Sequence, residues 1–487
     1  MPSADLRARL GELSDLQHVS GLLAWDQQVT MPPAGGPARA SASGVVEGLI
    51  HDRLVAPQLG ALLDDAADED ARLVRAVRRD HETARRVPAE LAAEMARASS
   101  DGLEVWLQAR EANDYAVFEP ALRRNVELAR RYAACFAEVE HPYDALLERF
   151  ERGTTAAQAS AMFVRLRGGL VPLLEEIAQQ PVPPPLSGPF PVAAQRAIGL
   201  QIAHAMGVDD EGWRIDETVH PFLVRLSHDD LRVTARYDER HLSGLFGVMH
   251  ETGHGLYEHG VDPALARTTL DTGTSLGVHE SQSRLWENLV GRSEPFWSHW
   301  LPRLREQLPQ ALEHVELDGF LRAINVVRPT LIRVEADELT YSLHVILRFE
   351  LELALIEGTL DTADLPQAWA AKMRELLGIE VPDDLRGVLQ DIHWSEGIIG
   401  YFPTYAIGNV LAAQLWGALR ADLPGLDDDL RAGRYGPLRE WLVDKVHRHG
   451  RLLEPAELVE HAVGGPLDPA PMLAHLDAKY RALYGLA

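Results

Sequence analysis

Along most of the chain, apolar residues recur at spacings of three and four residues, which is the pattern of helices that bury one face. The clearest examples are Ala71–Arg85, Glu119–Glu140, Ala156–Gln179 and Leu331–Glu357. Prolines and glycines separate these periodic stretches, as they commonly do at helix ends. The pattern predicts a mainly helical protein.

The segment 181–191, PVPPPLSGPFP, interrupts the helical pattern for longer than the other breaks. Proline lacks the backbone donor that a helix needs, so this segment is the best candidate for a linker. The helical pattern resumes after it, and the sequence has no internal repeat or low-complexity region. We therefore expect residues 1–487 to form one domain with an internal linker near 181–191.

The stretch His220–Asp238 differs from the rest, because apolar and polar residues alternate from Leu231 to Arg236. Alternation with a period of two, with β-branched residues among them, indicates a strand or a hairpin. A short sheet of this kind can offer an unpaired edge to an extended peptide. Such an edge supplies backbone hydrogen bonds that do not depend on side-chain identity.

Composition narrows the class of protein. Hydrophobic residues make up 46% of the 487 residues, which is enough for a large core. The net charge of −26 repels phosphate backbones and anionic membrane surfaces. Cys135 is the only cysteine, so neither an internal disulfide nor a cysteine metal site can form. We find neither a signal peptide nor a transmembrane run, and expect a soluble, cytoplasmic protein that binds no nucleic acid and no membrane.

His250, Glu251 and His254 form an H-E-x-x-H motif. On a helix, residues four apart lie on one face, so both imidazoles can reach one metal ion. Glu251 is rotated by about 100° from His250 and is free to take a proton from a metal-activated water. The alternative is a pair of surface histidines without a metal.

A catalytic zinc site takes three protein ligands and keeps one open position. Downstream of the motif, Glu280 shares a helical face with Arg284 and Glu287 and is the leading candidate for the third ligand. Spacing alone leaves four alternatives open: His259, Asp271, His279 and Glu287.

Two glycines, Gly253 and Gly255, flank His254. Each costs about 1 kcal/mol of helix stability relative to alanine. We therefore expect packing around the motif, or a close approach of another backbone, to compensate for them.

Six short motifs occur in an order that resembles the carboxypeptidase Taq family of metallopeptidases. They are HPF at 220–222, DLRVT at 230–234, HETGH at 250–254, HESQ at 279–282, IRVEAD at 332–337 and GVLQDIHW at 387–394. The opening, LLAWD at 22–26 followed by MP at 31–32, resembles the family as well. The resemblance extends from about residue 15 to the C-terminal helices.

The resemblance implies a mainly helical fold with a deep groove between two helical halves and a small sheet at its floor. It also implies a homodimer, and Glu280 as the third metal ligand. The implied metal is Zn²⁺, with Co²⁺ as an alternative in the same site. Peptides with a free C-terminus are the implied substrates, with proline disfavoured as the released residue.

A carboxypeptidase must bind a terminal carboxylate, for which an arginine is well suited. The predicted helix after Pro329 carries a row of polar side chains on one face, from Arg333 to Arg348. A solvated helix face is the ordinary interpretation of such a row. The IRVEAD match favours Arg333 as the anchor, and Arg348 is a second substrate-binding candidate or an ion-pair partner of Glu352.

The segment 390–405, QDIHWSEGIIGYFPTY, is rich in aromatic residues and glycines. Such a segment near a metal can supply hydrogen-bond donors for an oxyanion and a wall for the substrate. We predict that His393 supports the polarised carbonyl and that Tyr405 contacts substrate, with Tyr401 as a further substrate-binding residue. Plain aromatic packing is the alternative for each.

Together these features predict a metal-dependent carboxypeptidase of broad specificity, with Glu251 as general base. An endopeptidase or dipeptidase of the same motif class is the nearest rival, because it would share the metal and Glu251. A non-catalytic helical protein with a structural metal is less well supported, since structural zinc sites are closed by four ligands and need no base. Nucleic-acid binding has no basic patch in its favour.

Overall fold

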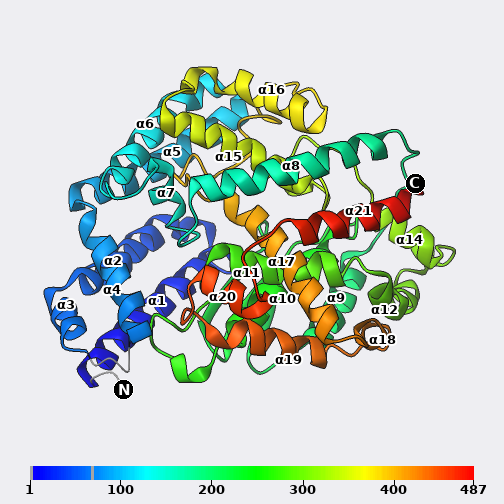
Figure 1. Ribbon diagram of the computed structural model, residues 1–487, viewed down its shortest axis with the longest axis horizontal. Helices are drawn as coiled ribbons and strands as arrows, with labels where there is room; N and C mark the ends of the chain where they lie inside the picture. Colours follow the sequence, from blue (N-terminus) through cyan, green and yellow to red (C-terminus); the bar gives the residue numbers. More distant parts are fainter. Residues whose placement is uncertain (1–3, 67–70, 487) are drawn as a thin grey trace.

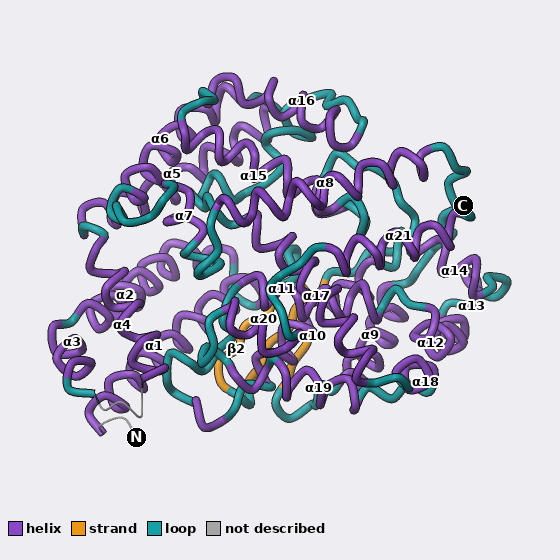
Figure 2. The backbone as a smooth tube through the Cα atoms, in the orientation of Figure 1, coloured by secondary structure: helices purple, strands orange, loops and turns teal. Residues whose placement is uncertain are grey.

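The structure, a computed structural model, describes residues 4–66 and 71–486. Almost all of its regular structure is helical, with one small sheet among the helices (Figures 1 and 2). The predicted fold class is confirmed. None of the described helices is long and apolar enough to cross a membrane.

The helices form two large halves, each around a hydrophobic core of its own, and a smaller N-terminal group. The first half, which includes the top of Figure 1, contains α5 (Ala89–Ala112), α6 (Tyr115–Ala133), α7 (Pro142–Leu147), α8 (Ala156–Ala178), α15 (Tyr341–Glu357), α16 (Leu365–Leu377) and α21 (Ala470–Tyr484). The second half contains the sheet and α9 (Val192–Met206), α10 (Ser243–His259), α11 (Leu276–Arg284), α12 (Glu294–Gln307), α13 (Pro309–Leu312), α14 (Leu317–Ile324), α18 (Leu426–Arg431), α19 (Gly436–Lys445) and α20 (Pro455–Val463). The N-terminal group consists of α1 (Ala4–Val29), α2 (Gly36–Val55), α3 (Pro57–Asp64) and α4 (Ala71–Arg86).

Helix α17 (Phe402–Asp422) belongs to both halves. Phe402 and Val410 are buried in the first core, whereas Leu411 and Leu415 are buried in the second. The segment 181–191 contains no helix or strand and leads from α8 in the first half to α9 in the second. The halves are therefore joined by a shared helix as well as by the chain that crosses between them.

The sheet has three strands, β1 (Trp213–Glu217), β2 (Leu223–Ser227) and β3 (Asp230–Ala235), in the order β1–β3–β2. The strands β2 and β3 are antiparallel, which confirms the predicted hairpin, and β1 runs parallel to β3. The strand β1 was not predicted, because five residues give too short an alternation to stand out. The apolar side of β3 packs against α10, and β2 is left at the edge of the sheet.

Three of the four clearest periodic stretches form helices, namely α4, α6 and α8. The prediction of one continuous helix over Leu331–Glu357 is wrong, because α15 begins only at Tyr341 and the residues around Arg333 form a separate short turn. The Asp337 carboxylate accepts backbone hydrogen bonds from Arg328 at 2.9 Å, Leu339 at 3.0 Å and Thr340 at 2.9 Å, and holds the chain in a loop before the helix. The row of side chains from Arg333 to Arg348 is therefore not one helical face.

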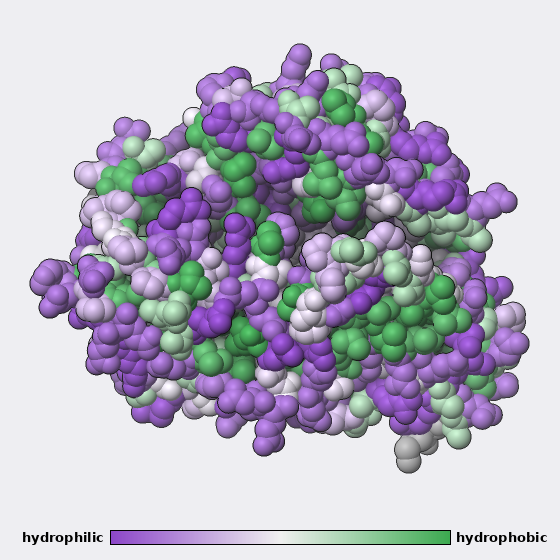
Figure 3. Space-filling view, turned by 180° about the vertical axis from the view of Figure 1, so that it is seen from behind, coloured by the Kyte–Doolittle hydropathy of each residue, from purple (hydrophilic) through white to green (hydrophobic). Residues whose placement is uncertain are grey.

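A groove of about 1770 Å³ lies where the two halves and the N-terminal helices meet. Its walls come from α1 and α4, the segment 132–155, α10, α11 and the start of α17, with Leu223 and Arg225 from the edge strand β2. From behind, the surface is hollowed between the halves as well (Figure 3). The groove expected from the resemblance is thus present.

Close contact between α10 and α11 explains the glycines around His254. A Cβ atom on Gly253 would lie 2.8 Å from the carbonyl oxygen of Gln282 on α11. A Cβ atom on Gly255 would lie 2.3 Å from the Trp213 ring. Both positions have no room for a side chain, so the glycines permit close packing on two sides of the motif.

We expect Gly253→Ala to destabilise the protein by about 1–3 kcal/mol, because the added methyl group forces two backbones apart. Gly247 on the same helix offers a matched control, since no atom outside its immediate chain lies within 4 Å of its Cβ position. Gly247→Ala should raise stability by up to about 1 kcal/mol. Thermal unfolding followed by circular dichroism measures both effects. Equal effects of the two substitutions would contradict the close approach.

Candidate metal centre and active site

Helix α10 presents both histidines of the motif on the groove side. The side chains of His250 and His254 are 18% and 17% exposed. Ser275 begins α11, because its hydroxyl accepts a hydrogen bond from the Val278 N–H at 3.2 Å. Glu280 follows on this helix, and its Oε2 atom lies 3.6 Å from His250 Nε2 and 3.5 Å from His254 Nε2.

These distances suit a shared metal ion better than direct hydrogen bonds. A charge-assisted hydrogen bond between nitrogen and oxygen measures about 2.7–2.9 Å. Two ligands at about 2.0–2.1 Å from a tetrahedral ion lie about 3.4 Å apart. The donor atoms of His250, His254 and Glu280 all lie within 4.8 Å of one another. The three residues therefore fit a catalytic metal site with one position left open.

The second ring nitrogen of each histidine has a partner of its own. His250 Nδ1 lies 2.8 Å from a carboxylate oxygen of Glu287, and His254 Nδ1 lies 2.7 Å from His279 Nδ1. His279 Nε2 in turn lies 2.8 Å from Glu258. If His279 Nε2 donates to Glu258, the Nδ1 atom of His279 carries no proton and accepts a hydrogen bond from His254 Nδ1. The Nε2 atoms of His250 and His254 are then left for a metal. Partners of this kind fix the orientation of metal-binding histidines.

Arg284 links the two acidic side chains of this group. Its guanidinium lies 2.7 Å from Glu280 and 3.2 Å from Glu287. Burial raises a carboxyl pKa, but Arg284 and the two histidines outweigh it and hold the pKa of Glu280 well below its usual range. The same balance lowers the pKa of Glu287 to about 2, and burial lowers the pKa of His254 to about 4. Near neutral pH, Glu280 is ionised and His254 is neutral, which are the forms that bind metals.

Glu251 lies on α10 beside these residues and is 7% exposed. It lines the groove, and its carboxylate has no hydrogen-bond partner among the described residues. Burial raises the pKa of Glu251 to about 7, and the nearby Glu280 and Glu287 add to the effect while His250 opposes it. A carboxyl group with such a pKa can take up and release a proton near neutral pH.

Tyr401, just before α17, and Tyr405, in the first turn of α17, lie in the groove wall. Their ring centroids are 5.2 Å apart. His393 lies behind them, with its Nε2 atom 3.2 Å from the Tyr405 hydroxyl. Burial, together with Arg333, lowers the pKa of His393 to about 3, and burial raises the pKa of Tyr401 to about 12. The imidazole is therefore neutral, and the Tyr401 hydroxyl keeps its proton.

Arg333 and Arg348 are buried behind Tyr405 and are not among the groove-lining residues. Both bind the same carboxylate, because Asp391 accepts from Arg333 at 2.9 Å and from Arg348 Nε at 2.6 Å. Arg333 also donates to the Tyr341 hydroxyl at 2.8 Å, and its guanidinium lies 4.8 Å from the centre of the Tyr405 ring. Two cations here face one anion, which leaves an excess of positive charge beside the groove wall.

The alternative pairing of Arg348 with Glu352 is not formed. Glu352 instead accepts hydrogen bonds from the Tyr143 hydroxyl at 2.6 Å, Trp394 Nε1 at 2.7 Å and the Gly400 N–H at 3.0 Å. Through the last two bonds it holds both ends of the segment between His393 and Tyr401. Glu352 therefore supports the aromatic wall from behind.

The other candidates for the third ligand have different surroundings. Asp271 is ion-paired with Arg225 at 2.7 Å, and His259 lies at the far end of α10. The remaining two candidates, Glu287 and His279, contact the Nδ1 atoms of His250 and His254 and so orient these rings. Glu258 was missed from the sequence, although it follows His254 by four residues and so shares its helical face.

Comparison with known proteins bears on this geometry. A family model for the Carboxypeptidase Taq (M32) metallopeptidases matches residues 5–480. The chain belongs to this family. Membership confirms the resemblance drawn from the six motifs, and it implies hydrolysis of peptides with a divalent metal ion.

Individual relatives cover nearly the whole chain. Thermostable carboxypeptidase 1 of Thermus thermophilus is 41% identical over 496 residues, with 97% of each chain covered. Carboxypeptidase 1 of Bacillus subtilis is 36% identical over 486 residues, covering 98% of this chain and 97% of the relative. An M32 carboxypeptidase from Deinococcus radiodurans has a solved structure that superposes with a TM-score of 0.97 at 40% identity, with 99% of each chain covered.

We expect Glu287→Gln to weaken metal binding, because it removes the anionic partner of His250 Nδ1 and keeps the size of the side chain. Loss of such an outer partner typically costs about 10–100-fold in metal affinity. Competition with a chromogenic chelator measures the effect. Glu82→Gln, at a groove-lining carboxylate on α4, serves as the control and should leave the affinity unchanged. Unchanged affinity in Glu287→Gln would show that this contact does not tune the site.

Glu352 gives a prediction for the pH dependence of stability. Burial raises its pKa from 4.5 to about 7 despite its three hydrogen bonds. Because the folded protein binds the Glu352 proton more tightly than the unfolded chain, this group contributes its full stabilisation below pH 4.5. The contribution is lost as the pH rises from 4.5 to 7, where the buried carboxyl group must ionise. The free energy of unfolding of the wild type, compared with that of Glu352→Gln, should therefore fall by up to about 3 kcal/mol between these two pH values. Melting temperatures of both proteins between pH 4.5 and 7 test this, and a constant difference would contradict it.

Proposed function

We propose that this protein is a zinc carboxypeptidase that removes the C-terminal residue of peptides with broad specificity. The observation behind the proposal is that His250, His254 and Glu280 have the spacing of metal ligands and line the same groove as Glu251. Two histidines and one glutamate are a ligand set of catalytic zinc sites. Co²⁺ is the alternative metal.

His250, His254 and Glu280 would hold the metal, which supplies Lewis-acid polarisation of the scissile carbonyl and acidifies a water. Glu251 takes the proton from the attacking water and later delivers it to the departing amine nitrogen. Its carboxylate suits this role because it faces the groove and is not held by a hydrogen bond to another described residue.

Tyr405 is positioned to stabilise negative charge on the carbonyl oxygen. Its hydroxyl donates a hydrogen bond to that oxygen in our proposal, and the neutral His393 behind it fixes its direction. A donor fixed in advance costs no reorganisation when the charge develops. Tyr401, next to it in the wall, contacts the substrate.

The excess positive charge behind Tyr405 would attract the terminal carboxylate to that end of the groove. Arg333 acts in this proposal through its charge and not by direct contact, since its guanidinium lies 4.8 Å from the centre of the Tyr405 ring and its side chain is buried. Arg348 contributes its charge and shares Asp391 with Arg333. A requirement for a free carboxylate is what makes the enzyme an exopeptidase.

Broad specificity fits a groove that binds the peptide backbone. No strand of the described part of the chain pairs with one edge of β2, and Leu223 and Arg225 from this strand line the groove. An extended peptide that adds to this edge gains backbone hydrogen bonds whatever its side chains.

An endopeptidase or dipeptidase of the same motif class would use the same metal and Glu251 but would not need a terminal carboxylate. The uncompensated charge at Arg333 and Arg348 favours the carboxypeptidase. A purely structural metal site is disfavoured, because such sites are closed by four protein ligands.

We expect the metal-loaded protein to release the C-terminal amino acid from an N-blocked dipeptide. Chelation should abolish release, and Glu251→Gln should lower kcat by at least about 100-fold, since general bases typically contribute that much. Amidation of the C-terminus should prevent cleavage. Chromatographic detection of the released amino acid measures each case.

Metal content of the Glu251→Gln protein is the control, because the substitution should leave the metal bound. Cleavage of the amidated peptide at the same rate would exclude the carboxypeptidase and support an endopeptidase. No cleavage of any peptide with metal bound would exclude a peptidase altogether.

A further inference from the structure

Arginines are frequent in the wall of the groove, although the chain carries a net charge of −26. Within the described part of the chain, most of them are ion-paired with a carboxylate. The paired arginines are Arg75, Arg78, Arg79, Arg86, Arg225 and Arg451. Arg149 and Arg152 line the same groove, but neither has a carboxylate partner among the described residues.

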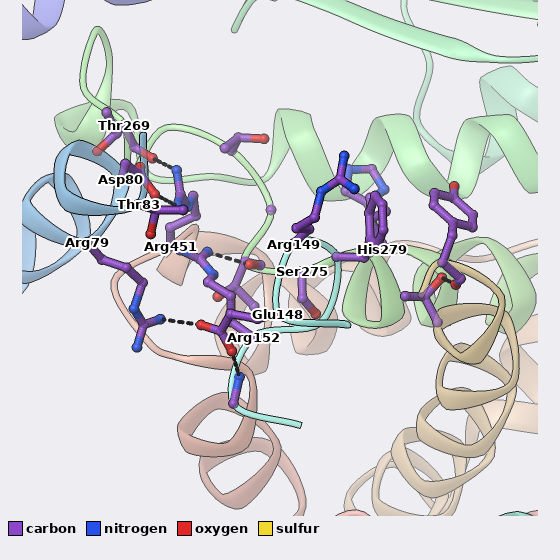
Figure 4. A pocket seen from close by; sticks show the side chains of 18 of the residues that line it. Arg79, Asp80, Thr83, Glu148, Arg149, Arg152, Thr269, Ser275, His279 and Arg451 are labelled. Carbon is purple, nitrogen blue, oxygen red and sulfur yellow. Dashed lines mark hydrogen bonds and ion pairs between the residues drawn. The ribbon is translucent and has the colours of Figure 1, made fainter. Parts of the chain in front are cut away.

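Arg149 is held by rings and not by anions. Its guanidinium lies 5.1 Å from the ring centre of Tyr132 and 5.1 Å from that of Phe150. The side chain is exposed and lines the groove, and no dashed line is drawn to it in Figure 4. Aromatic contacts restrain a guanidinium and leave its N–H groups free, so Arg149 can bind a carboxylate through two parallel hydrogen bonds.

Arg152 adds a second positive charge on the same short segment between α7 and α8. One of its nitrogens donates to the carbonyl oxygen of Thr274 at 2.6 Å, and its other donors have no hydrogen-bond partner among the described residues. Glu151, which adjoins Arg152 in sequence, is buried and accepts hydrogen bonds from the Ser275 hydroxyl at 2.9 Å and the Gly277 N–H at 2.7 Å. Glu148, which adjoins Arg149, is also directed elsewhere. The Glu148 carboxylate accepts a hydrogen bond from the Gly153 N–H at 2.8 Å, and its other oxygen lies 3.9 Å from a guanidinium nitrogen of Arg79 (Figure 4). The segment therefore presents two positive charges that form no ion pair with a described carboxylate, and Glu454 and Asp80 act on Arg152 only from a longer distance.

A row of ring contacts relates this segment to the catalytic residues. The Phe150 ring lies 5.1 Å from that of Tyr401, which lies 5.2 Å from that of Tyr405. Arg333 lies behind Tyr405, at the other end of the row from Arg149. If the terminal carboxylate is anchored near Arg333, the preceding residues of the peptide extend along the groove toward Arg149.

We propose that Arg149 and Arg152 form a subsite that binds an acidic side chain of the peptide, upstream of the residue that is released. The proposal rests on the function proposed above, from which it takes the direction of the bound peptide. The overall charge of the protein repels acidic peptides at long range. The subsite offsets this repulsion inside the groove, where the attraction is local.

The test uses the metal-loaded enzyme and N-blocked peptides with the same terminal residue. One series carries a glutamate, scanned through the positions upstream of the terminal residue, and the other carries glutamine at the same positions. At the position that reaches the subsite, the wild type should favour the glutamate peptide by about tenfold in kcat/KM. Added salt should reduce this preference, since it screens exposed charges.

The double variant Arg149→Gln, Arg152→Gln should lose the preference and retain the wild-type rate on the glutamine peptides. Arg78→Gln is the matched control, because Arg78 lines the same groove but is paired with Asp64 at 2.7 Å. That control should keep the preference. Melting temperatures of both variants verify that they fold.

Two outcomes would overturn the subsite. One is a wild type that treats both series alike at every position. The other is an equal loss on both series in the double variant, because the arginines would then bind a feature that all the peptides share, such as the terminal carboxylate.

Binding of the same peptides to the Glu251→Gln protein, measured by calorimetry, separates this proposal from the function on which it rests. If no peptide is cleaved by the wild type, the proposed function fails. A preference for glutamate in binding that disappears when Arg149 and Arg152 are also replaced would still support the subsite, and its absence would exclude it.

Discussion

The close packing of α10 on α11 is the constraint on which the proposed metal centre depends, because its three candidate ligands come from two helices. At Gly253 the helices leave no room for a Cβ atom, which would lie 2.8 Å from the Gln282 carbonyl oxygen. This crossing brings Glu280 within 3.6 Å of the Nε2 atoms of both His250 and His254. A side chain at the crossing would separate the helices and the donors with them. The helix propensity lost at a glycine, about 1 kcal/mol, is small by comparison with the binding of a metal, for which about 10 kcal/mol or more is typical at structural zinc sites.

The same crossing buries several ionisable groups, and their charge balance separates their roles. Arg284 contacts both Glu280 and Glu287 and lies over the Tyr341 ring at 4.3 Å, so these two carboxylates are ionised. Glu251, on the neighbouring helix, has no such partner, and burial raises its pKa. Carboxyl groups whose pKa values are pushed apart by their surroundings are suited to different roles. Arg284 thus distinguishes the proposed metal ligand Glu280 and its neighbour Glu287 from the candidate base Glu251.

The sequence was sufficient to predict those features that depend on interactions between residues close together in the chain. Spacing along one helix predicted that His250 and His254 share a face, and alternation predicted the hairpin. Glu280 could be chosen over its competitors only through the family resemblance, because spacing says nothing about which helix packs against α10. The helix proposed around Arg333 was wrong because the Asp337 carboxylate binds backbone groups and holds a loop there. Whether a groove arginine is paired depends on distant residues, which periodicity does not reveal.

The shared helix α17 determines which parts of the groove stay together. It packs against α11 so closely that a Cβ on Gly408 would lie 2.6 Å from Glu280 Cβ, and Tyr405 is one turn earlier on the same helix. The spacing of Tyr405 from the metal donors is therefore fixed by direct helix packing. The segment that carries Arg149 is joined to α11 as well, because the Phe150 carbonyl oxygen accepts from the Leu276 N–H at 3.1 Å and the Glu151 carboxylate accepts from the Gly277 N–H at 2.7 Å. The helix that carries Glu280 therefore also holds the segment of Arg149, so the proposed subsite keeps its place relative to the proposed metal donors.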